Sequence, residues 1–267
     1  MNRIDKKFQE LKKENKKAFI AYITAGDPSL DATKRIVLTL ENAGADIIEL
    51  GIPFSDPLAD GPVIQAASHR ALQNKVTLKK IFTMTGILRK AADIPIVFMT
   101  YYNPVLRYGV EKFIKSCKHK GVDGVIIPDL PYEEAGDLIR YAKREGIATI
   151  FLAAPTSTRK RIKEIVKNSA GFIYYVSLTG VTGARQNLPP EVASNVRMIK
   201  SITKKPVAVG FGISAPRQAR DIVRIADGAI VGSAIVKMIA DNARNNKNML
   251  SKVSSFSKSL AKAIHRE

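Results

Sequence analysis

Short apolar runs alternate with amphipathic stretches along most of this chain. Each run is a near-continuous set of hydrophobic residues, which is typical of strands that are buried on both faces of a parallel sheet. The pattern predicts strands at residues 19–24, 47–50, 94–100, 124–127, 148–152, 172–176, 206–209 and 228–231.

Apolar residues at helical spacing fill the intervals between these runs. Ser29 or Asp31 can cap the first expected helix, and Gly44 ends it. Gly121 and Gly146 stand just past two others, where glycine commonly follows a helix. The spacing predicts helices at residues 31–43, 78–91, 111–119, 132–145, 159–167, 190–202 and 215–224.

Eight strands, each followed by a helix, predict an α/β fold of the (β/α)8 TIM-barrel type. We expect a single domain over residues 1–267, because no linker or low-complexity tract divides the chain. A doubly wound open sheet is the alternative fold. It is disfavoured because ITAGDP stands at the end of the first strand in place of a glycine fingerprint.

Further helices are expected at the two ends of the chain. Ile4, Phe8 and Leu11 fall at helical spacing and predict an extra amphipathic N-terminal helix that caps part of the fold. Residues 234–264 have a helical pattern with a polar break around residues 245–248. We expect this run to pack against the fold with one solvated face.

The chain of 267 residues carries 43 Lys and Arg against 24 Asp and Glu, a net charge of +19. A protein this basic can bind nucleic acid or an anionic membrane. The lysines are spread along the sequence, however, and neither a nucleic-acid motif nor interleaved aromatic residues accompany them. We therefore expect no nucleic-acid partner, and the reason for the surplus charge stays open.

The sequence predicts neither a membrane protein nor a secreted one. No apolar stretch is long enough to span a bilayer, and the basic N-terminus lacks the hydrophobic segment of a secretory signal. Cys117 is the one cysteine, which excludes an internal disulfide and favours a reducing, cytoplasmic location. We interpret Cys117 as a small half-buried side chain and not as a nucleophile. The neighbouring base, His119, is two residues away and therefore off the helical face of Cys117.

Two carboxylates lie in the stretch DIIELGIPFSDPLADG, residues 46–61. Glu49 is inside an apolar run, where an acid is costly to bury unless it is paired or its pKa is raised. Asp60 follows on a turn-rich loop that can fold back over the end of the strand. A lone buried glutamate is commonly a satisfied core residue, but two acids in different environments are what acid–base chemistry requires.

Active-site residues of a TIM barrel lie at the carboxyl ends of its strands. Polar and aromatic residues gather at several of these positions, although the start of any loop tends to be polar. Besides Glu49 and Asp60, the candidates are Thr100, Tyr101 and Tyr102 at the end of the third strand, Asp129 after the fourth, and Tyr174 and Tyr175 at the end of the sixth.

Glycine-rich segments follow the last three predicted strands. They read SLTGVTGARQN (177–187), GFGIS (210–214) and GSAIV (232–236). Backbone N–H groups in the loops after the seventh and eighth strands form the usual phosphate site of this fold, and glycine lets the phosphate approach them. GFGIS is not GxGxxG, and GVTGA lacks the Lys-Ser/Thr of a P-loop, so we expect a phosphate rather than a nucleotide.

The other residue types narrow the chemistry. A Schiff-base aldolase needs a lysine inside the barrel, and no predicted strand contains one. A zinc-dependent aldolase needs clustered histidines, whereas His69, His119 and His265 lie on separate segments, so no metal site is predicted. Proton transfer by two carboxylates on a phosphorylated substrate remains.

The segments AYITAGDP, IELGIPFSDPLADGPVIQ, YYNPV, PDLP, SLTGVTGAR and GFGIS occur in this order. Together they resemble the tryptophan synthase α subunit family over residues 18–239, and the segment with Glu49 and Asp60 corresponds to the family signature. The resemblance implies retro-aldol cleavage of indole-3-glycerol phosphate to indole and glyceraldehyde 3-phosphate. It also implies an α2β2 complex with a pyridoxal-phosphate β subunit that receives the indole, and no cofactor in this chain.

By this resemblance, Glu49 matches the catalytic acid and base, and Asp60 the carboxylate that interacts with the indole N–H. Thr182 matches the loop residue that closes onto Asp60. The substrate pocket is assigned to Tyr22, Thr100, Tyr102, Tyr174 and Thr182, the phosphate site to Gly183, Gly212, Gly232 and Ser233, and the partner interface to Pro53, Asp56 and Asn103.

Two alternatives stay open. A stand-alone lyase of the same family has the same residues but no partner, and only an interface, or activity without a β subunit, separates the two. A basic binding protein that kept the fold and lost the reaction is the other. The presence of Glu49, Asp60 and the phosphate-site glycines argues against it.

Overall fold

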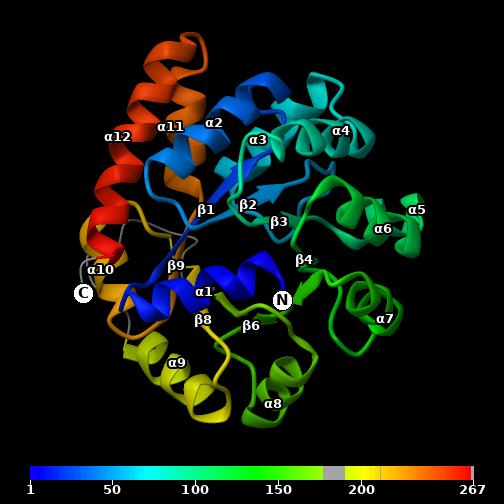
Figure 1. The fold of residues 1–267 in the computed structure, drawn as a ribbon, viewed down its shortest axis with the longest axis vertical. Helices are drawn as coiled ribbons and strands as arrows, with labels where there is room; N and C mark the ends of the chain where they lie inside the picture. Colours follow the sequence, from blue (N-terminus) through cyan, green and yellow to red (C-terminus); the bar gives the residue numbers. More distant parts are fainter. Residues whose placement is uncertain (177–189, 211, 266–267) are drawn as a thin grey trace.

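A parallel sheet, with nine strands in the described part of the chain, forms the centre of the molecule (Figure 1). The computed structural model describes residues 1–176, 190–210 and 212–265. The strands are β1 (Ala18–Thr24), β2 (Ile47–Gly51), β3 (Ile96–Met99), β4 (Gly124–Ile126), β5 (Ala148–Ile150), β6 (Leu152–Ala153), β7 (Ile173–Val176), β8 (Val207–Gly210) and β9 (Gly228–Val231).

The sheet closes into a barrel. Its strand order is β5-β4-β3-β2-β1-β9-β8-β7-β6, so β5 and β6 stand at the two ends of the order. In the chain, only Phe151 separates β5 from β6. They are therefore two parts of the fifth predicted strand, and the prediction of a (β/α)8 TIM barrel is confirmed.

Helices surround this barrel (Figure 1). They are α1 (Arg3–Lys13), α2 (Leu30–Asn42), α3 (Pro62–Gln73), α4 (Leu78–Leu88), α5 (Tyr102–Tyr108), α6 (Val110–Lys120), α7 (Gly136–Glu145), α8 (Arg159–Asn168), α9 (Pro190–Ile202), α10 (Pro216–Val223), α11 (Ser233–Asn242) and α12 (Asn246–His265).

The predicted helices are present with some different ends. α7 begins at Gly136 and not at residue 132, because residues 132–134 form a turn. α3 and α5 lie outside the predicted ranges. The C-terminal run is helical as α11 and α12, and its break falls at residues 243–245.

Side chains along the strands alternate between two cores, as the pleat of a strand requires. On β1, Phe19, Ala21 and Ile23 face the surrounding helices, whereas Ile20 faces the barrel interior. Fully burying one such Phe or Ile side chain contributes about 1.5–3 kcal/mol. The buried apolar residues of the interior are Ala18, Ile20, Ile47, Val97, Ile126, Ala148, Ile150, Phe172, Ala208 and Ile230, together with three residues of α1.

α1 closes the amino-terminal end of the barrel. Its buried Ile4, Phe8 and Leu11 belong to the interior cluster, and the Phe8 ring lies 5.8 Å from that of Phe172. Figure 1 shows α1 crossing the barrel near the chain's N-terminus. The predicted N-terminal helix is therefore confirmed, and a site inside the barrel must be reached from the carboxyl ends of the strands.

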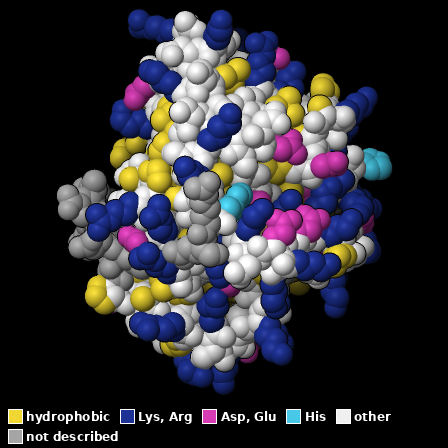
Figure 2. Space-filling view, turned by 60° about the vertical axis from the view of Figure 1, so that its left-hand side comes forward, with side chains coloured by type: hydrophobic (Ala, Val, Ile, Leu, Met, Phe, Trp, Pro, Cys, Tyr) yellow, Lys and Arg dark blue, Asp and Glu magenta, His cyan; other side chains and the backbone are white. Residues whose placement is uncertain are grey.

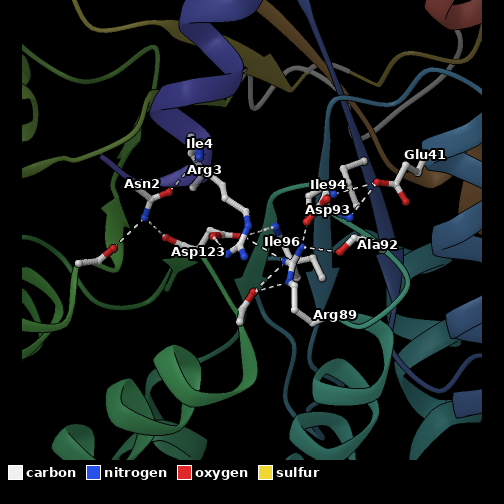
Figure 3. A network of polar contacts seen from close by, with 12 residues as sticks. Asn2, Arg3, Ile4, Glu41, Arg89, Ala92, Asp93, Ile94, Ile96 and Asp123 are labelled. Atoms are coloured by element: carbon white, nitrogen blue, oxygen red, sulfur yellow. Dashed lines mark hydrogen bonds and ion pairs between the residues drawn. The ribbon is translucent and has the colours of Figure 1, made fainter.

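A polar network fastens α1 to the barrel (Figure 3). The Asn2 side chain accepts a hydrogen bond from the N–H of Ile4 at the start of α1. It also donates from Nδ2 to the carbonyl of Asp123 at 2.7 Å. The Asp123 carboxylate accepts from Arg3 (3.1 Å), from Arg89 (3.2 Å) and from the N–H of Ile96 (2.9 Å). The carboxylate is 4% exposed, so these bonds compensate a buried charge that would otherwise be costly.

Part of the surplus positive charge lies where helix dipoles favour it. A helix C-terminus carries partial negative charge, and a cation there is stabilising by about 0.3–1 kcal/mol. On the face shown in Figure 2, Lys and Arg side chains are spread over the surface and form no single stripe. Cations in last turns include Lys12, Lys13, Lys118, Lys120, Lys143, Arg144, Lys167 and Lys200.

The structure also bears on Cys117 and on the absence of membrane spans that the sequence predicts. Cys117 is fully buried, more than the half-buried position predicted, and burial raises the pKa of its thiol well above the ordinary value. Within the ranges that the structure describes, no helix combines the length and the apolar character needed to cross a membrane.

Candidate active site

Glu49 points into the barrel from the middle of β2, two residues before the strand ends at Gly51. It is in register with Tyr22 of β1 and Val97 of β3, and alternation puts it on the same face as the inward Ile47. The side chain is 1% exposed. Burial raises the pKa of Glu49 to about 8, and the charge of Asp60 adds to the rise.

The Glu49 carboxyl is also unusual in its contacts. Among the described residues, neither of its oxygens has a hydrogen-bond partner. Most buried side-chain polar atoms in proteins have at least one partner, so a carboxyl without one needs an explanation. A carboxyl with a perturbed pKa at a barrel mouth is a strong candidate for binding a ligand or transferring a proton.

Asp60 lies on the loop after β2, where Tyr101 holds it. The Tyr101 hydroxyl donates to the Asp60 carboxylate at 3.1 Å and accepts from the N–H of Ala59 at 3.0 Å. The Tyr101 ring is stacked on Phe54 of the same loop, with 5.2 Å between ring centroids. Burial raises the pKa of Asp60 to about 6, although the Tyr101 hydrogen bond opposes the rise.

The two carboxyls therefore titrate apart. Between about pH 6 and pH 8, Asp60 is ionised and Glu49 keeps its proton. The two titrations are coupled, because the charge of Asp60 contributes to the raised pKa of Glu49. Near neutral pH this mouth offers one proton donor and one carboxylate, which is a division of roles typical of acid–base catalysis.

Tyr22 and Tyr174 form aromatic walls beside Glu49. Burial raises the pKa of both phenols well above the ordinary value, so both stay neutral. Each ring lies over a glycine: a Cβ at Gly51 would overlap the Tyr22 hydroxyl, and one at Gly210 would stand 2.8 Å from the Tyr174 hydroxyl. These glycines are thus required by ring packing at the mouth.

The residues after β3 differ from the sequence assignment. Thr100 is buried and its hydroxyl donates to the carbonyl of Tyr101 at 3.4 Å. The Tyr102 ring packs against the outer core, so the structure does not bring it to the mouth. Met99, which packs against Tyr22, and Tyr101, which holds Asp60, take that place. Tyr101 was already a candidate at this rim, and alternation from the inward Val97 is the signal that could have identified Met99.

The described phosphate-site candidates lie after the adjacent strands β8 and β9. Gly212 is exposed with φ +34°, and among the described residues beyond its chain neighbours no atom lies within 4 Å of a Cβ built there. Gly232 precedes α11, and Ser233 is that helix's first residue. The first N–H groups of a helix have no partner within it and favour anions. Thr182 and Gly183 lie outside the described residues.

The three interface candidates lie on the segments around Asp60. Pro53 is buried in the loop after β2, and Asp56 is exposed on the same loop, where it accepts from the Ser55 hydroxyl at 2.8 Å. Asn103 is exposed in the first turn of α5. Leu58, 93% exposed, stands between Asp56 and Asp60. A surface contact at this loop can therefore affect the position of Asp60.

Comparison with known proteins identifies the family. The family model described as tryptophan synthase alpha chain matches residues 8–265. The chain belongs to this family. Among relatives named tryptophan synthase alpha chain, that of Caldanaerobacter subterraneus subsp. tengcongensis is 52% identical over 264 residues, covering 99% of this chain and 100% of the relative. That of Geobacter sulfurreducens is 50% identical over 238 residues, covering 89% of this chain and 90% of its own.

Solved structures of tryptophan synthase have the same fold as this chain. Tryptophan synthase subunit alpha from Legionella pneumophila superposes with a TM-score of 0.92 at 38% identity, covering 99% of this chain and 98% of that one. A chain of Mycobacterium tuberculosis tryptophan synthase gives a TM-score of 0.92 at 34% identity, with 100% and 99% covered. As a tryptophan synthase alpha chain, this protein has a lyase role in tryptophan synthesis.

Proposed function

We propose that this chain cleaves indole-3-glycerol phosphate to indole and glyceraldehyde 3-phosphate by a retro-aldol reaction. The observation that carries the proposal is the pair of carboxyls at the barrel mouth. Glu49 has a pKa of about 8 and Asp60 one of about 6, so one is an acid and the other a carboxylate at neutral pH. This reaction needs both.

Glu49 supplies and recovers the proton in this mechanism. Its carboxylic acid protonates the indole ring carbon that bears the glycerol chain, which turns the ring into an electron sink. The resulting Glu49 carboxylate then takes the proton of the adjacent hydroxyl. The carbon–carbon bond breaks, its electron pair returns to the indole, and the hydroxyl carbon becomes the aldehyde. The proton that Glu49 gave is replaced, so the step is balanced.

Asp60 stabilises the charge that forms on the ring. As the ring carbon is protonated, positive charge develops at the indole N–H, and the carboxylate of Asp60 accepts a hydrogen bond from this N–H. Tyr22 and Tyr174 flank the ring, and the N–H groups at Gly183, Gly212, Gly232 and Ser233 hold the phosphate. Closure of Thr182 onto Asp60 excludes water.

We propose a tryptophan synthase β subunit as the partner, in an α2β2 complex in which the β subunit alone carries pyridoxal phosphate. The exposed Leu58, Asp56 and Asn103 support a contact at the loop that carries Asp60. A stand-alone lyase is the alternative. Indole release from indole-3-glycerol phosphate, assayed alone and in a titration with β subunit, tests both ideas. No release by either preparation contradicts the reaction, and release that β subunit does not accelerate favours the stand-alone enzyme.

Gly212→Leu is expected to weaken binding of glycerol phosphate at least about tenfold, because a side chain would stand over the anion and φ +34° is strained for leucine. Isothermal titration calorimetry measures the change. Gly146→Leu is the matched control. It shares a positive φ (+70°) and open surroundings, but it ends α7 at the opposite end of the barrel. Equal affinity for the Gly212 variant and the wild-type protein would exclude this loop from the phosphate site.

Tyr101→Phe is expected to lower kcat/KM for indole release about tenfold, since a hydrogen bond to a charged group is worth about 1.5–3 kcal/mol. The lost bond opposes the rise of the Asp60 pKa, so the acid limb of the pH profile should move to higher pH. Phe keeps the stack on Phe54. Tyr108→Phe, which loses only a contact with Ser116, is the control. An unmoved acid limb contradicts the assignment.

A further inference from the structure

An ion pair between a partly exposed arginine and a buried aspartate joins α3 to the loop that follows β1. Arg70 donates from Nε and Nη2 to the two carboxylate oxygens of Asp27, at 2.8 and 2.7 Å. Asp27 is 3% exposed. Two parallel bonds of this kind fix orientation as well as distance, which a single ion pair does not. The pair therefore holds α3 in one direction relative to the barrel.

The loop that carries Asp27 is itself anchored to the barrel. The N–H of Ala25 donates to the carbonyl of Gly51 at 2.8 Å, and the N–H of Gly26 donates to the Thr33 hydroxyl at 2.9 Å. Next to the ion pair, Asn74 donates from Nδ2 to the carbonyl of Pro28 at 2.7 Å. The C-terminal half of α3 is thus bonded to a loop that is itself held on the barrel.

The other end of α3 leads directly to Asp60. Gly61 caps α3 at its start, so the helix begins two residues after Asp60. Gln65 donates from Nε2 to the carbonyl of Asp60 at 2.8 Å. Ala67 of α3 forms a buried cluster with Tyr22 and Val236, and Val63 and Ile64 pack against this cluster. A shift of α3 therefore moves Asp60 relative to Glu49 and Tyr22.

We propose that Arg70 is a positioning residue for the reaction, acting with Asp27 as a clamp that sets where α3 presents Asp60. Such an ion pair is weak as a source of stability, because solvent screens the partly exposed Arg70 and the desolvation of Asp27 offsets the attraction. Its advantage here is fixed geometry. The kinetic part of this inference rests on the proposed function, whereas the placement of Asp60 does not.

Arg70 acts on Asp60 through position and not through its charge. The causes that set the Asp60 pKa are burial and the Tyr101 hydrogen bond. The titratable groups coupled to Asp60 are Glu49 on β2, Tyr22 on β1, Tyr101 after β3 and Tyr174 on β7. Loss of the clamp lets Asp60 become more exposed, so its pKa falls from about 6 toward the ordinary value of 3.8.

The test is a 13C NMR titration of the Asp60 carboxyl in Arg70→Met, which needs no substrate. We expect the Asp60 pKa to fall by roughly one unit or more. We expect Arg70→Lys, which keeps the charge without the two parallel bonds, to give a smaller fall. Arg140→Met breaks an exposed pair with Asp137 on α7 and is the control. An unchanged Asp60 pKa in both Arg70 variants, with only a lower melting temperature, would overturn the clamp.

Kinetics separate the clamp from the proposed function. In Arg70→Met, kcat for indole release should fall about tenfold with KM changed less than twofold, because the phosphate site lies on the β8 and β9 loops. A rise in KM with kcat unchanged contradicts the clamp. If the wild-type chain releases no indole with or without β subunit, the proposed reaction fails. The Asp60 titration still decides the placement of Asp60.

Discussion

Glu49→Gln is expected to lower kcat for indole release by about 10³–10⁴, near the upper end of what a positioned general acid and base contributes. Glutamine has the shape of glutamate but can neither give nor take the proton. The Glu49 carboxyl makes no hydrogen bond to another described residue, so the substitution breaks no contact of this kind. The loss of rate should therefore come with an intact fold.

Turnover is measured at pH 7 by indole release, and the fold by circular dichroism and binding of glycerol phosphate. Glu133→Gln is the control, because Glu133 is exposed on the turn before α7, where it pairs with Arg161 away from the barrel mouth. Turnover within tenfold of the wild-type rate in Glu49→Gln would remove Glu49 from the role of acid and base.

The same variant should also change how stability depends on pH. The pKa of Glu49 is about 8 in the folded protein, against an ordinary value of 4.5. A raised pKa means that the folded state holds the proton more tightly, so this contribution to stability is complete below pH 4.5 and is lost as pH rises toward 8. The melting temperature of Glu49→Gln relative to wild type should therefore increase across this range. A constant difference contradicts the raised pKa.

The strand pattern was sufficient to predict the barrel and Glu49. Buried parallel strands are almost wholly apolar, so one acid within such a run stands out. The same pattern could not give the direction of residues after β3. Thr100 and Tyr102 are polar and aromatic, as a pocket residue would be, yet the strand ends at Met99 and α5 begins at Tyr102. Where a strand becomes a helix, composition does not decide which side chains face inward.

The Asp27–Arg70 pair and the Tyr101–Asp60 bond could not be predicted from the sequence either. Their partners are 43 and 41 residues apart, and each depends on how a loop folds back onto the barrel. Such contacts arise from the tertiary arrangement and not from local propensity. The sequence could identify the acids, and Tyr101 as a residue of the rim, but not the bonds that hold Asp60 in place.

Asp60→Asn is expected to lower kcat about 10²–10³-fold, because an amide cannot stabilise the positive charge that forms at the indole N–H as a carboxylate does. The loop should keep its position, since the Tyr101 hydroxyl can donate to the amide oxygen as it does to the carboxylate. The charge of Asp60 also raises the Glu49 pKa, so its removal should lower that pKa.

The profile of kcat/KM between about pH 5 and pH 10 distinguishes these two effects of Asp60. In the wild-type protein we expect an acid limb near pH 6 from Asp60 and an alkaline limb near pH 8 from Glu49. Asp60→Asn should lose the acid limb and move the alkaline limb to lower pH, whereas Asp137→Asn on the exposed face of α7 should change neither. If the alkaline limb stays near pH 8, burial alone sets the Glu49 pKa, and the two acids work without electrostatic coupling.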